Sequence, residues 1–459
     1  MSQLPADCLE EIFEYLEDDQ ITLNSCLLIN HLWCEVSVGI LWKKIRNFNT
    51  LIECMSNESK EILHRNGIFI STLTLNPPMF NYASFCKFLS VDDVYYNIRR
   101  LLKETSISSE HNIYVVSQEI FKLLMSQITS LKKLTIFDLS LRQNTTFTSY
   151  PGAKNCLRDL SELHCRSNVY HEFFDRLSQI CHNIQILYIS FKKAISNGLM
   201  DLISAQQNLK CLIMEQFFEY INLGGLITKI PNTLTKLDIF GGDHYIPLSF
   251  ISKLSNLQEL VLSFYHSDAL EDFKILQYIN FPQLKSLKFR YKCPSYDFLI
   301  KFLEINGRNL KELYISESND SLNSIIIEFC PNLRKLYTEF TIYELETLKM
   351  LFNNCKYLES IKIYCKGCFS EKDLFEIIAK YSPKTFHELE LNYSYNSKSE
   401  LLPEELESFF MSWANRIPHK PLSLIIVDDE CSFEKNEENM KIIEKYIKLG
   451  VVRNLNIKL

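Results

Sequence analysis

The sequence predicts an α/β solenoid in which short strands line a concave face and helices cover the convex face. Three observations support this fold class. The spacing L-x-x-L-x-[L/I/F], as at residues 310–315, returns along most of the chain. Apolar residues change to helical periodicity between the copies. One copy has too little apolar surface to bury itself, whereas stacked copies bury their leucines against one another.

The regular copies begin at residues 131, 160, 184, 209, 234, 257, 284, 310, 333, 358 and 386. Their starts lie 23 to 29 residues apart, which is the period of leucine-rich repeats. Within a copy, inward apolar side chains alternate with outward ones, as expected for a strand. Between copies, sets such as Leu345, Leu348, Leu351 and Phe352 predict a helix. The array, residues 131–400, therefore predicts a leucine-rich-repeat horseshoe.

The N-terminal segment, residues 1–46, predicts three short helices. Leu4-Pro5 opens a stripe formed by Leu9, Ile12 and Phe13 at helical spacing, and proline is tolerated in a first helical turn. An acidic break at residues 17–19 ends this helix. Further apolar residues then predict two more helices: Leu23, Cys26, Leu27, Ile29, Trp33, Val36, Val38, Leu41 and Trp42.

Taken together, these residues resemble the F-box, a helical module of cullin-type ubiquitin ligases. The positions that carry the resemblance are Leu4, Pro5, Leu9, Ile12, Phe13, Leu16, Leu23, Ile29, Trp33, Leu41 and Trp42. Cys26 stands where the family usually has leucine, and His31-Leu32 where it often has basic residues.

The resemblance implies an α/β protein with a three-helix F-box followed by repeats that capture a protein target for ubiquitin transfer. It implies that the F-box docks a Skp-type adaptor and, through it, a cullin-RING ligase. The adaptor-binding residues implied are Leu4, Pro5, Leu9, Ile12, Phe13, Leu16, Leu27 and Ile29. Trp33 and Trp42 are expected in the core of the module.

An alternative role for the same helices stays open. A solenoid needs a polar-faced end unit, and three helices supply one without binding any adaptor. The protein would then be a non-ligase leucine-rich-repeat scaffold or recognition protein. The two hypotheses differ in where Leu4, Pro5 and Leu9 lie, because capping alone buries them against the first repeats.

The segments that flank the array are less regular. Residues 47–130 predict a helical linker and an irregular first repeat, with an isolated strand motif at residues 70–75 that two prolines stop. Helices are expected around residues 93–103 and 117–127. Residues 401–459 predict a C-terminal capping repeat, in which a helix through residues 440–447 ends at Gly450 before a last strand.

Composition limits the classes of function. The chain of 459 residues is 46% hydrophobic and 23% charged, and no apolar run approaches the roughly 18 residues that a membrane helix needs. The first residues carry acids and a proline where a secretory signal would be basic and apolar, so we expect a cytoplasmic or nuclear protein with no membrane contact. A net charge of −7 disfavours nucleic acid as a partner.

Fifteen cysteines without a compact spacing pattern predict reduced thiols. Cys181, Cys330 and Cys355 each lie three residues before a copy, so we expect them to pack at the ends of convex helices. The C-x-x-C at residues 365–368 lacks a second pair of zinc ligands at a recognisable spacing. Many repeats of this type carry Asn or Cys just beyond the strand. Residues such as Gly242 occupy that position here, so no side-chain ladder is expected in those turns.

Enzyme signatures are absent from the sequence. It has no phosphate-binding, dinucleotide-binding, G-x-S-x-G or H-E-x-x-H motif. We therefore expect a non-catalytic subunit without metal or cofactor.

The residues between the inward leucines form the remaining candidate site, because they line the concave face. Aromatic and basic side chains cluster there, and tyrosine and arginine dominate interface energies. The predicted substrate-binding residues are Lys288, Arg290, Glu312, Tyr314, Tyr337, Glu339, Lys362 and Tyr364. Tyrosines also suit strands and charges also solvate a surface, so an ordinary concave face remains the alternative interpretation.

Overall fold

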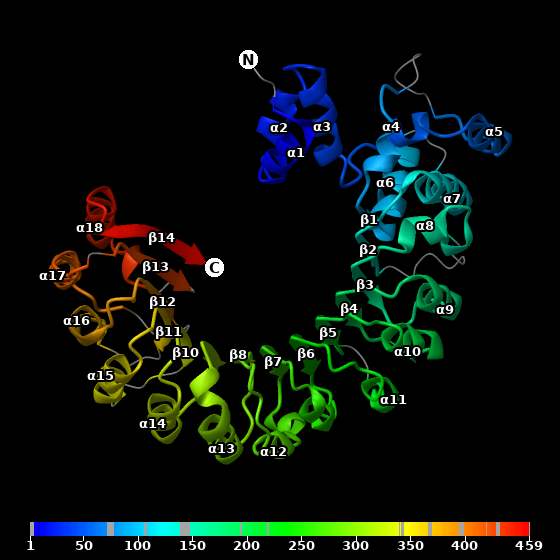
Figure 1. Cartoon of the computed structure of the whole chain (residues 1–459). Coiled ribbons are helices and arrows are strands. Elements are labelled where there is room, and N and C mark those ends of the chain that lie inside the picture. The colour runs from blue at the N-terminus through cyan, green and yellow to red at the C-terminus, as the bar shows by residue number, and fades with distance from the viewer. Residues whose placement is uncertain are drawn as a thin grey trace. The chain divides into compact units, whose positions relative to one another are not determined.

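A computed structural model describes residues 4–70, 78–104, 108–137, 147–192, 195–217, 220–338, 340, 344–365, 370–393, 399–418, 420–427 and 432–458. It divides into two compact units. Unit 1 comprises Met1–Leu212 and Gly225–Thr233, and unit 2 comprises Ile213–Gly224 and Leu234–Leu459. In each unit the helices that alternate with the strands lie along one side of them (Figure 1). No helix within these ranges is long and apolar enough to span a bilayer.

Unit 1 begins with the three predicted helices, α1 (Ala6–Glu14), α2 (Gln20–Cys26) and α3 (His31–Leu41). Asp19 and Asn30 start α2 and α3 because their side chains accept hydrogen bonds from the backbone N–H of the third residue of each helix. The three helices share a core of their own, formed by Leu9, Phe13, Leu23, Cys26, Ile40 and Leu41. Trp33 packs against it, with its ring centroid 5.1 Å from that of Phe13.

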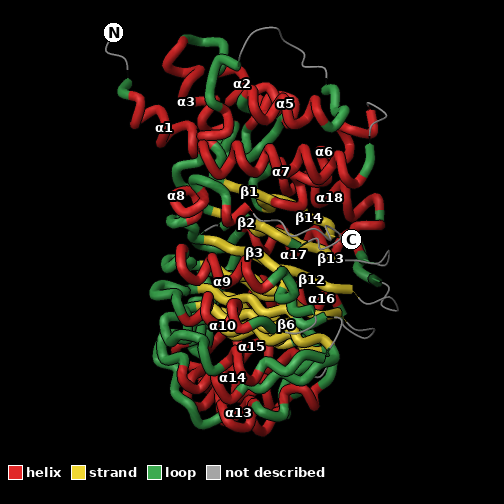
Figure 2. The backbone as a smooth tube through the Cα atoms, turned by 90° about the vertical axis from the view of Figure 1, so that its right-hand side faces the viewer, coloured by secondary structure: helices red, strands yellow, loops and turns green. Residues whose placement is uncertain are grey.

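The remainder of unit 1 alternates helices and strands. The helices are α4 (Phe48–Glu53), α5 (Asn57–Arg65), α6 (Val91–Glu104), α7 (Glu110–Gln127), α8 (Ala153–Leu157), α9 (His171–Ile180), α10 (Asn197–Ser204) and α11 (Gly224–Ile227). The strands are β1 (Phe88–Ser90), β2 (Lys133–Ile136), β3 (Glu162–Arg166), β4 (Ile186–Ser190) and β5 (Cys211–Glu215), the last of which crosses the boundary between the units. Strands β1 to β3 run side by side and pair in parallel (Figure 2).

Strand β1 was not predicted from the sequence. The segment lacks the leucine spacing, but the backbone N–H groups of Lys87 and Phe88 both donate to the carbonyl oxygen of Lys43 at 2.9 Å. Phe88 also pairs with Lys133 of β2. The strand motif predicted at residues 70–75 lies almost entirely outside the described residues. The two helices expected between residues 93 and 127 are present, and both begin earlier than predicted.

Unit 2 continues the same alternation. Its helices are α12 (Phe273–Leu276), α13 (Tyr296–Asn306), α14 (Asp320–Phe329), α15 (Leu345–Asn354), α16 (Glu371–Tyr381), α17 (Pro403–Ala414) and α18 (Glu437–Lys448). Its strands are β6 (Lys236–Gly242), β7 (Glu259–Phe264), β8 (Ser286–Phe289), β9 (Glu312–Ile315), β10 (Lys335–Thr338), β11 (Ser360–Cys365), β12 (Glu388–Tyr393), β13 (Leu422–Val427) and β14 (Val452–Lys458). They pair in parallel and in chain order.

The repeat pattern predicted the position of every strand from β2 to β12. Each of these strands begins two residues after the first apolar residue of a predicted copy. In the copy at residues 310–315, Leu310, Leu313 and Ile315 are at most 2% exposed, so all three inward positions are core. Parallel strands in chain order, with helices on one face, confirm the predicted leucine-rich-repeat class in each unit.

A polar ladder joins neighbouring repeats at the end of the convex helices. The Cys181 thiol donates to the carbonyl oxygen of Leu157 at 3.1 Å, and Gln206 Nε2 donates to the carbonyl oxygen of Cys181 at 2.8 Å. In unit 2 the Cys355 thiol donates to the carbonyl oxygen of Cys330 at 3.5 Å. These cysteines are buried and follow the last helical residue, which confirms the predicted packing role. The ladder therefore lies between the end of a convex helix and the strand that follows it in the sequence.

Candidate functional site

Helix α1 carries two apolar stripes, of which one is buried. Leu9 and Phe13 are each 2% exposed and belong to the core of the helical module, and Leu16 packs against that core. Residues spaced by three or four positions share one face of a helix. This stripe is the one that an end cap requires.

The second stripe of α1 faces solvent. Cys8, Ile12 and the C-cap residue Tyr15 follow one another at intervals of four and three residues, and Leu4 lies just before the helix; all four are exposed. The exposed fractions are 52% for Leu4, 47% for Ile12 and 92% for Tyr15. Each of these three side chains therefore leaves about half or more of its surface open to solvent.

Exposed apolar residues continue on α2 and the turn that follows it. Ile21 is 81%, Leu28 88% and Ile29 55% exposed. We define the exposed set of the module as Leu4, Pro5, Ile12, Tyr15, Ile21, Leu28 and Ile29. A group of large apolar side chains on so small a module is unusual for a surface that stays in water.

The structure divides the predicted adaptor-binding residues into two groups. Leu4, Pro5, Ile12 and Ile29 are exposed. Leu9 and Phe13 are interior, so their side chains have no surface to offer a partner, and we correct their role to packing. Leu16 and Leu27 are half-buried against the module core. The sequence analysis missed three exposed residues, namely Tyr15, Ile21 and Leu28.

The module joins the first repeats through the end of α3. The rings of Trp42 and Tyr82 lie 4.5 Å apart between centroids, and the carbonyl oxygen of Lys43 accepts the two hydrogen bonds from the start of β1. The backbone of Lys44 forms an isolated parallel β-bridge with Phe88 of that strand. This junction caps the array, and it does not use the exposed set, which lies on α1 and α2.

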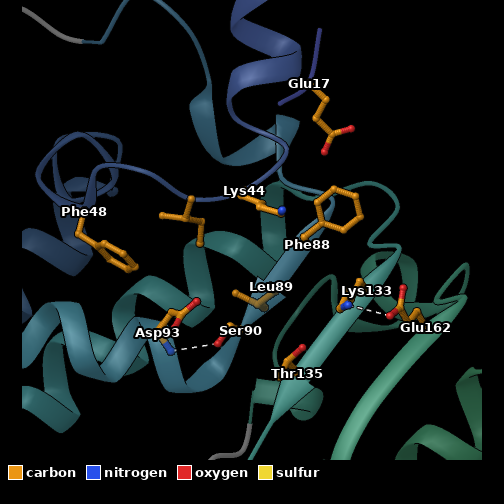
Figure 3. A pocket seen from close by; sticks show the side chains of 11 residues that line it. Glu17, Lys44, Phe48, Phe88, Leu89, Ser90, Asp93, Lys133, Thr135 and Glu162 are labelled. Carbon is orange, nitrogen blue, oxygen red and sulfur yellow. Dashed lines mark hydrogen bonds and ion pairs between the residues drawn. The ribbon is translucent and has the colours of Figure 1, made fainter. Parts of the chain in front are cut away.

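A pocket of about 570 Å³ lies in unit 1 where the chain after α3 passes strands β1 to β3 (Figure 3). One ion pair crosses it, with Lys133 Nζ 2.7 Å from Glu162 Oε1, and Lys44 Nζ lies 5.6 Å from the centroid of the Phe88 ring. The described residues hold no group of three or more side chains able to ligate a metal. The pocket therefore offers an ion pair, a lysine over an aromatic ring and an apolar wall.

Strand register aligns the outward residues of unit 2 into rows on the concave face. One row places Asp238, Val261, Lys288, Tyr314, Tyr337, Lys362 and Glu390 side by side. Neighbours in such a row lie close enough to interact directly. The predicted substrate-binding residues are therefore brought together from successive repeats.

Lys288 is held between two carboxylates. Its Nζ lies 3.2 Å from Glu259 Oε1 and 3.1 Å from Glu312 Oε2. Burial alone would lower the pKa of Lys288, but the hydrogen bonds and charges of Glu312 and Glu259 raise it above its usual range. Arg290 is half exposed, and its Nη2 lies 3.4 Å from Asp238 Oδ2. Burial raises the pKa of Asp238 despite this arginine.

Tyr314 and Tyr337 form a stack at the centre of the face. Their ring centroids are 3.9 Å apart and their planes differ by 14°. Lys362 Nζ lies 4.7 Å from the centroid of the Tyr337 ring and 2.6 Å from Glu390 Oε1. Burial raises the pKa of Tyr314, which is therefore a neutral hydroxyl at physiological pH. Of the other predicted residues, Glu339 and the side chain of Tyr364 lie outside the described part of the chain.

A second aromatic cluster adjoins the first and was not among the predicted binding residues. Phe217 stacks on Phe240 with ring centroids 5.6 Å apart. The Tyr265 ring contacts both Phe240, at 5.7 Å, and Tyr291, at 4.8 Å. Phe217 and Tyr291 are 49% and 45% exposed. Aligning the copies by register, rather than reading only the residues between the leucines, would have placed these rings together.

Comparison with known proteins gives likenesses to solved structures only. No protein-family model and no curated protein sequence matches the chain. The crystal structure of the yeast Rad7 and Elc1 complex matches with 15% identity and a TM-score of 0.46, over 80% of this chain and 87% of that chain.

Two bacterial repeat proteins also match. The leucine-rich repeat-containing protein LegL7 of Legionella pneumophila shows 16% identity and a TM-score of 0.34, over 69% of this chain and 90% of that one. A leucine-rich-repeat protein of Leptospira interrogans shows 17% identity and a TM-score of 0.34, over 74% and 92%. At such scores the fold assignment rests on the strand order and repeat spacing of this chain itself.

Proposed function

We propose that this protein is the substrate-recognition subunit of a Skp-cullin-F-box type E3 ubiquitin ligase. The exposed set of the module docks a Skp-type adaptor, and the concave face of the repeats binds the target protein. The protein performs no chemistry itself. It holds the target near the ubiquitin-conjugating machinery, so that transfer depends on a high effective concentration.

The observation that carries the proposal is the second apolar stripe of α1. An end cap needs one buried stripe, which Leu9 and Phe13 already provide. Solvent exposure of Leu4, Ile12 and Tyr15 has no role in capping and costs solubility unless a partner covers them. This exposed stripe supports a docking role for the module in addition to capping.

Co-purification with a Skp-type adaptor tests the proposal. We expect Ile12→Asp and Leu28→Asp to weaken adaptor binding about 30-fold or more, because each places a charge in a contact that must be desolvated. Met350→Asp is the matched control, since this methionine of α15 is 56% exposed and lies outside the exposed set. Circular dichroism checks that the module stays folded. Binding of the Ile12 variant at wild-type strength, or no adaptor binding by the wild-type chain, would overturn the proposal.

A repeat scaffold is the second candidate, and the junction at Trp42 and Lys43 favours it, because the module does cap the first repeats. The two functions predict different results in one assay. A scaffold retains its targets in cells after Ile12→Asp and never recovers an adaptor. A ligase subunit recovers the adaptor and loses turnover of the target in that variant.

A further inference from the structure

Six rings on successive repeats of unit 2 line the concave face in two groups. We define the aromatic strip as Phe217, Phe240, Tyr265, Tyr291, Tyr314 and Tyr337. Ring contacts link its first four members. The Tyr314–Tyr337 stack on β9 and β10 forms the second group, because the strand register pairs Tyr314 with Lys288, three residues before Tyr291. Phe240 also reaches Tyr291 across one intervening repeat, with ring centroids 6.1 Å apart.

The strip itself has no room for a compact ligand between its rings. Phe240, Tyr265 and Tyr291 stand nearly perpendicular to one another, as in cages that bind alkylated ammonium groups. Their centroids, however, are only 4.8 to 6.1 Å apart, so the rings fill the space that a cation would need. A ligand must therefore lie on top of the rings and along them.

The charges beside the strip are already compensated within the protein. Lys288 is paired with Glu259 and Glu312, and Arg290 with Asp238. A strongly acidic or basic partner would have to break these pairs to gain new ones. Charge complementarity therefore favours an uncharged segment.

Spacing and hydrogen-bonding capacity favour one uncharged class. A polyproline II helix repeats about every 9.3 Å, and two strand spacings of about 4.8 Å add up to about 9.6 Å, so each turn of such a helix meets every second repeat. A proline-rich segment offers carbonyl acceptors and few N–H donors. Tyrosine hydroxyls and the half-exposed guanidinium of Arg290 supply donors on this surface.

We propose that the aromatic strip binds a proline-rich segment of the target protein as a polyproline II helix that lies across strands β5 to β10. Such segments dock on aromatic-lined surfaces because their conformation is preformed and little entropy is lost. The inference rests on the proposed function, because it names the chemistry of the target that the ligase subunit recognises. Binding of the segment itself needs no adaptor.

Fluorescence anisotropy on the full chain tests the inference with a labelled oligoproline peptide about nine residues long, or three turns. A glycine–serine peptide of equal length is the probe control. We expect saturable binding of oligoproline alone, nearly unchanged between about 50 and 300 mM salt. Tyr291→Ala and Tyr337→Ala should each weaken it about 30-fold, the loss typical of one aromatic hot spot. Tyr357→Ala, at an exposed tyrosine outside the strip, should leave it unchanged.

Three results would overturn the inference: equal affinity for the glycine–serine peptide, equal binding by the Tyr291 and Tyr357 variants, or tighter, salt-sensitive binding of an acidic peptide. Adaptor co-purification by the same variants separates this failure from that of the proposed function. Retained adaptor binding without oligoproline binding refutes the inference alone. Oligoproline binding without adaptor binding refutes the ligase assignment alone.

Discussion

Gln206 provides the sharpest test of how the repeats are held together. Its side chain is 3% exposed and bridges two repeats of unit 1. The Oε1 atom accepts a hydrogen bond from the backbone N–H of Ile184 at 2.8 Å, and Nε2 donates to the carbonyl oxygens of Cys181 and Leu202, each also at 2.8 Å. Alanine at this position removes all three bonds at once.

The expected cost follows from the groups left behind. Ile184, Cys181 and Leu202 are fully buried, so Gln206→Ala leaves one N–H and two carbonyl groups without that partner. Each unsatisfied buried group costs about 1–3 kcal/mol, which gives about 2–6 kcal/mol for the two groups, the N–H of Ile184 and the carbonyl of Cys181, that join the repeats. Gln206→Cys should cost less, about 1–3 kcal/mol, because a thiol at this position of another copy reaches the preceding carbonyl oxygen.

Hydrogen exchange is the appropriate assay, since a repeat array does not unfold in one step and has no single unfolding free energy. Exchange of the Ile184 amide should accelerate about 30-fold to 10⁴-fold in the alanine variant and less in the cysteine variant. Wild-type exchange in the Gln206→Ala protein, or faster exchange in the cysteine variant than in the alanine variant, would contradict the bridging role of Gln206.

Three further predictions concern unit 2. Leu313→Ala should lower the local stability of β9 by about 2–5 kcal/mol through lost burial and a cavity, measured by amide exchange; a loss below about 1 kcal/mol would contradict it. Gly307→Ala should lower the local stability where α13 meets α14 by about 1–3 kcal/mol, because its Cβ would lie 2.7 Å from the carbonyl oxygen of the last residue of α14; amide exchange in α14 measures this loss, and unchanged exchange would contradict it. Burial would raise the pKa of Glu259, but Lys236 and Lys288 lower it below its usual range. The stabilisation from Glu259 is therefore present above the unfolded pKa of about 4.3 and is lost as pH falls through the lower folded value. An NMR titration of Glu259 should show this depressed pKa, and Lys288→Met should raise it; a carboxyl that titrates at its usual pKa in the wild type would refute the pairing.

The repeat motif was enough to predict strands β2 to β12, because its leucines are the residues through which every copy packs against its neighbours. Strand β1 was not predicted, because it depends on hydrogen bonds to the carbonyl oxygen of Lys43, which is distant in the sequence and outside the repeat motif. The hydrogen bonds of the polar ladder were not predicted either. A signal was present, because Cys181, Gln206 and Cys355 all lie three residues before a copy and can all donate a hydrogen bond.

The candidate site was predicted less completely than the fold. Apolar spacing identifies the stripes of α1, but it does not say which stripe the module buries, so Leu9 and Phe13 were assigned to the wrong side. The position of Tyr15 at helical spacing from Ile12 was a usable signal for the exposed stripe. On the concave face, residue types were visible in the sequence, whereas the pairing of Lys288 with two carboxylates required the strand register.

The measurement that bears most directly on the central claim is hydrogen exchange by mass spectrometry of the full chain with and without a Skp-type adaptor. The adaptor should slow exchange in α1, α2 and the turn that carries Leu28 and Ile29, where the exposed set lies. Exchange in strands β6 to β12 should stay unchanged. Protection on the repeats, or an unchanged module in a sample where the adaptor is bound, would contradict it.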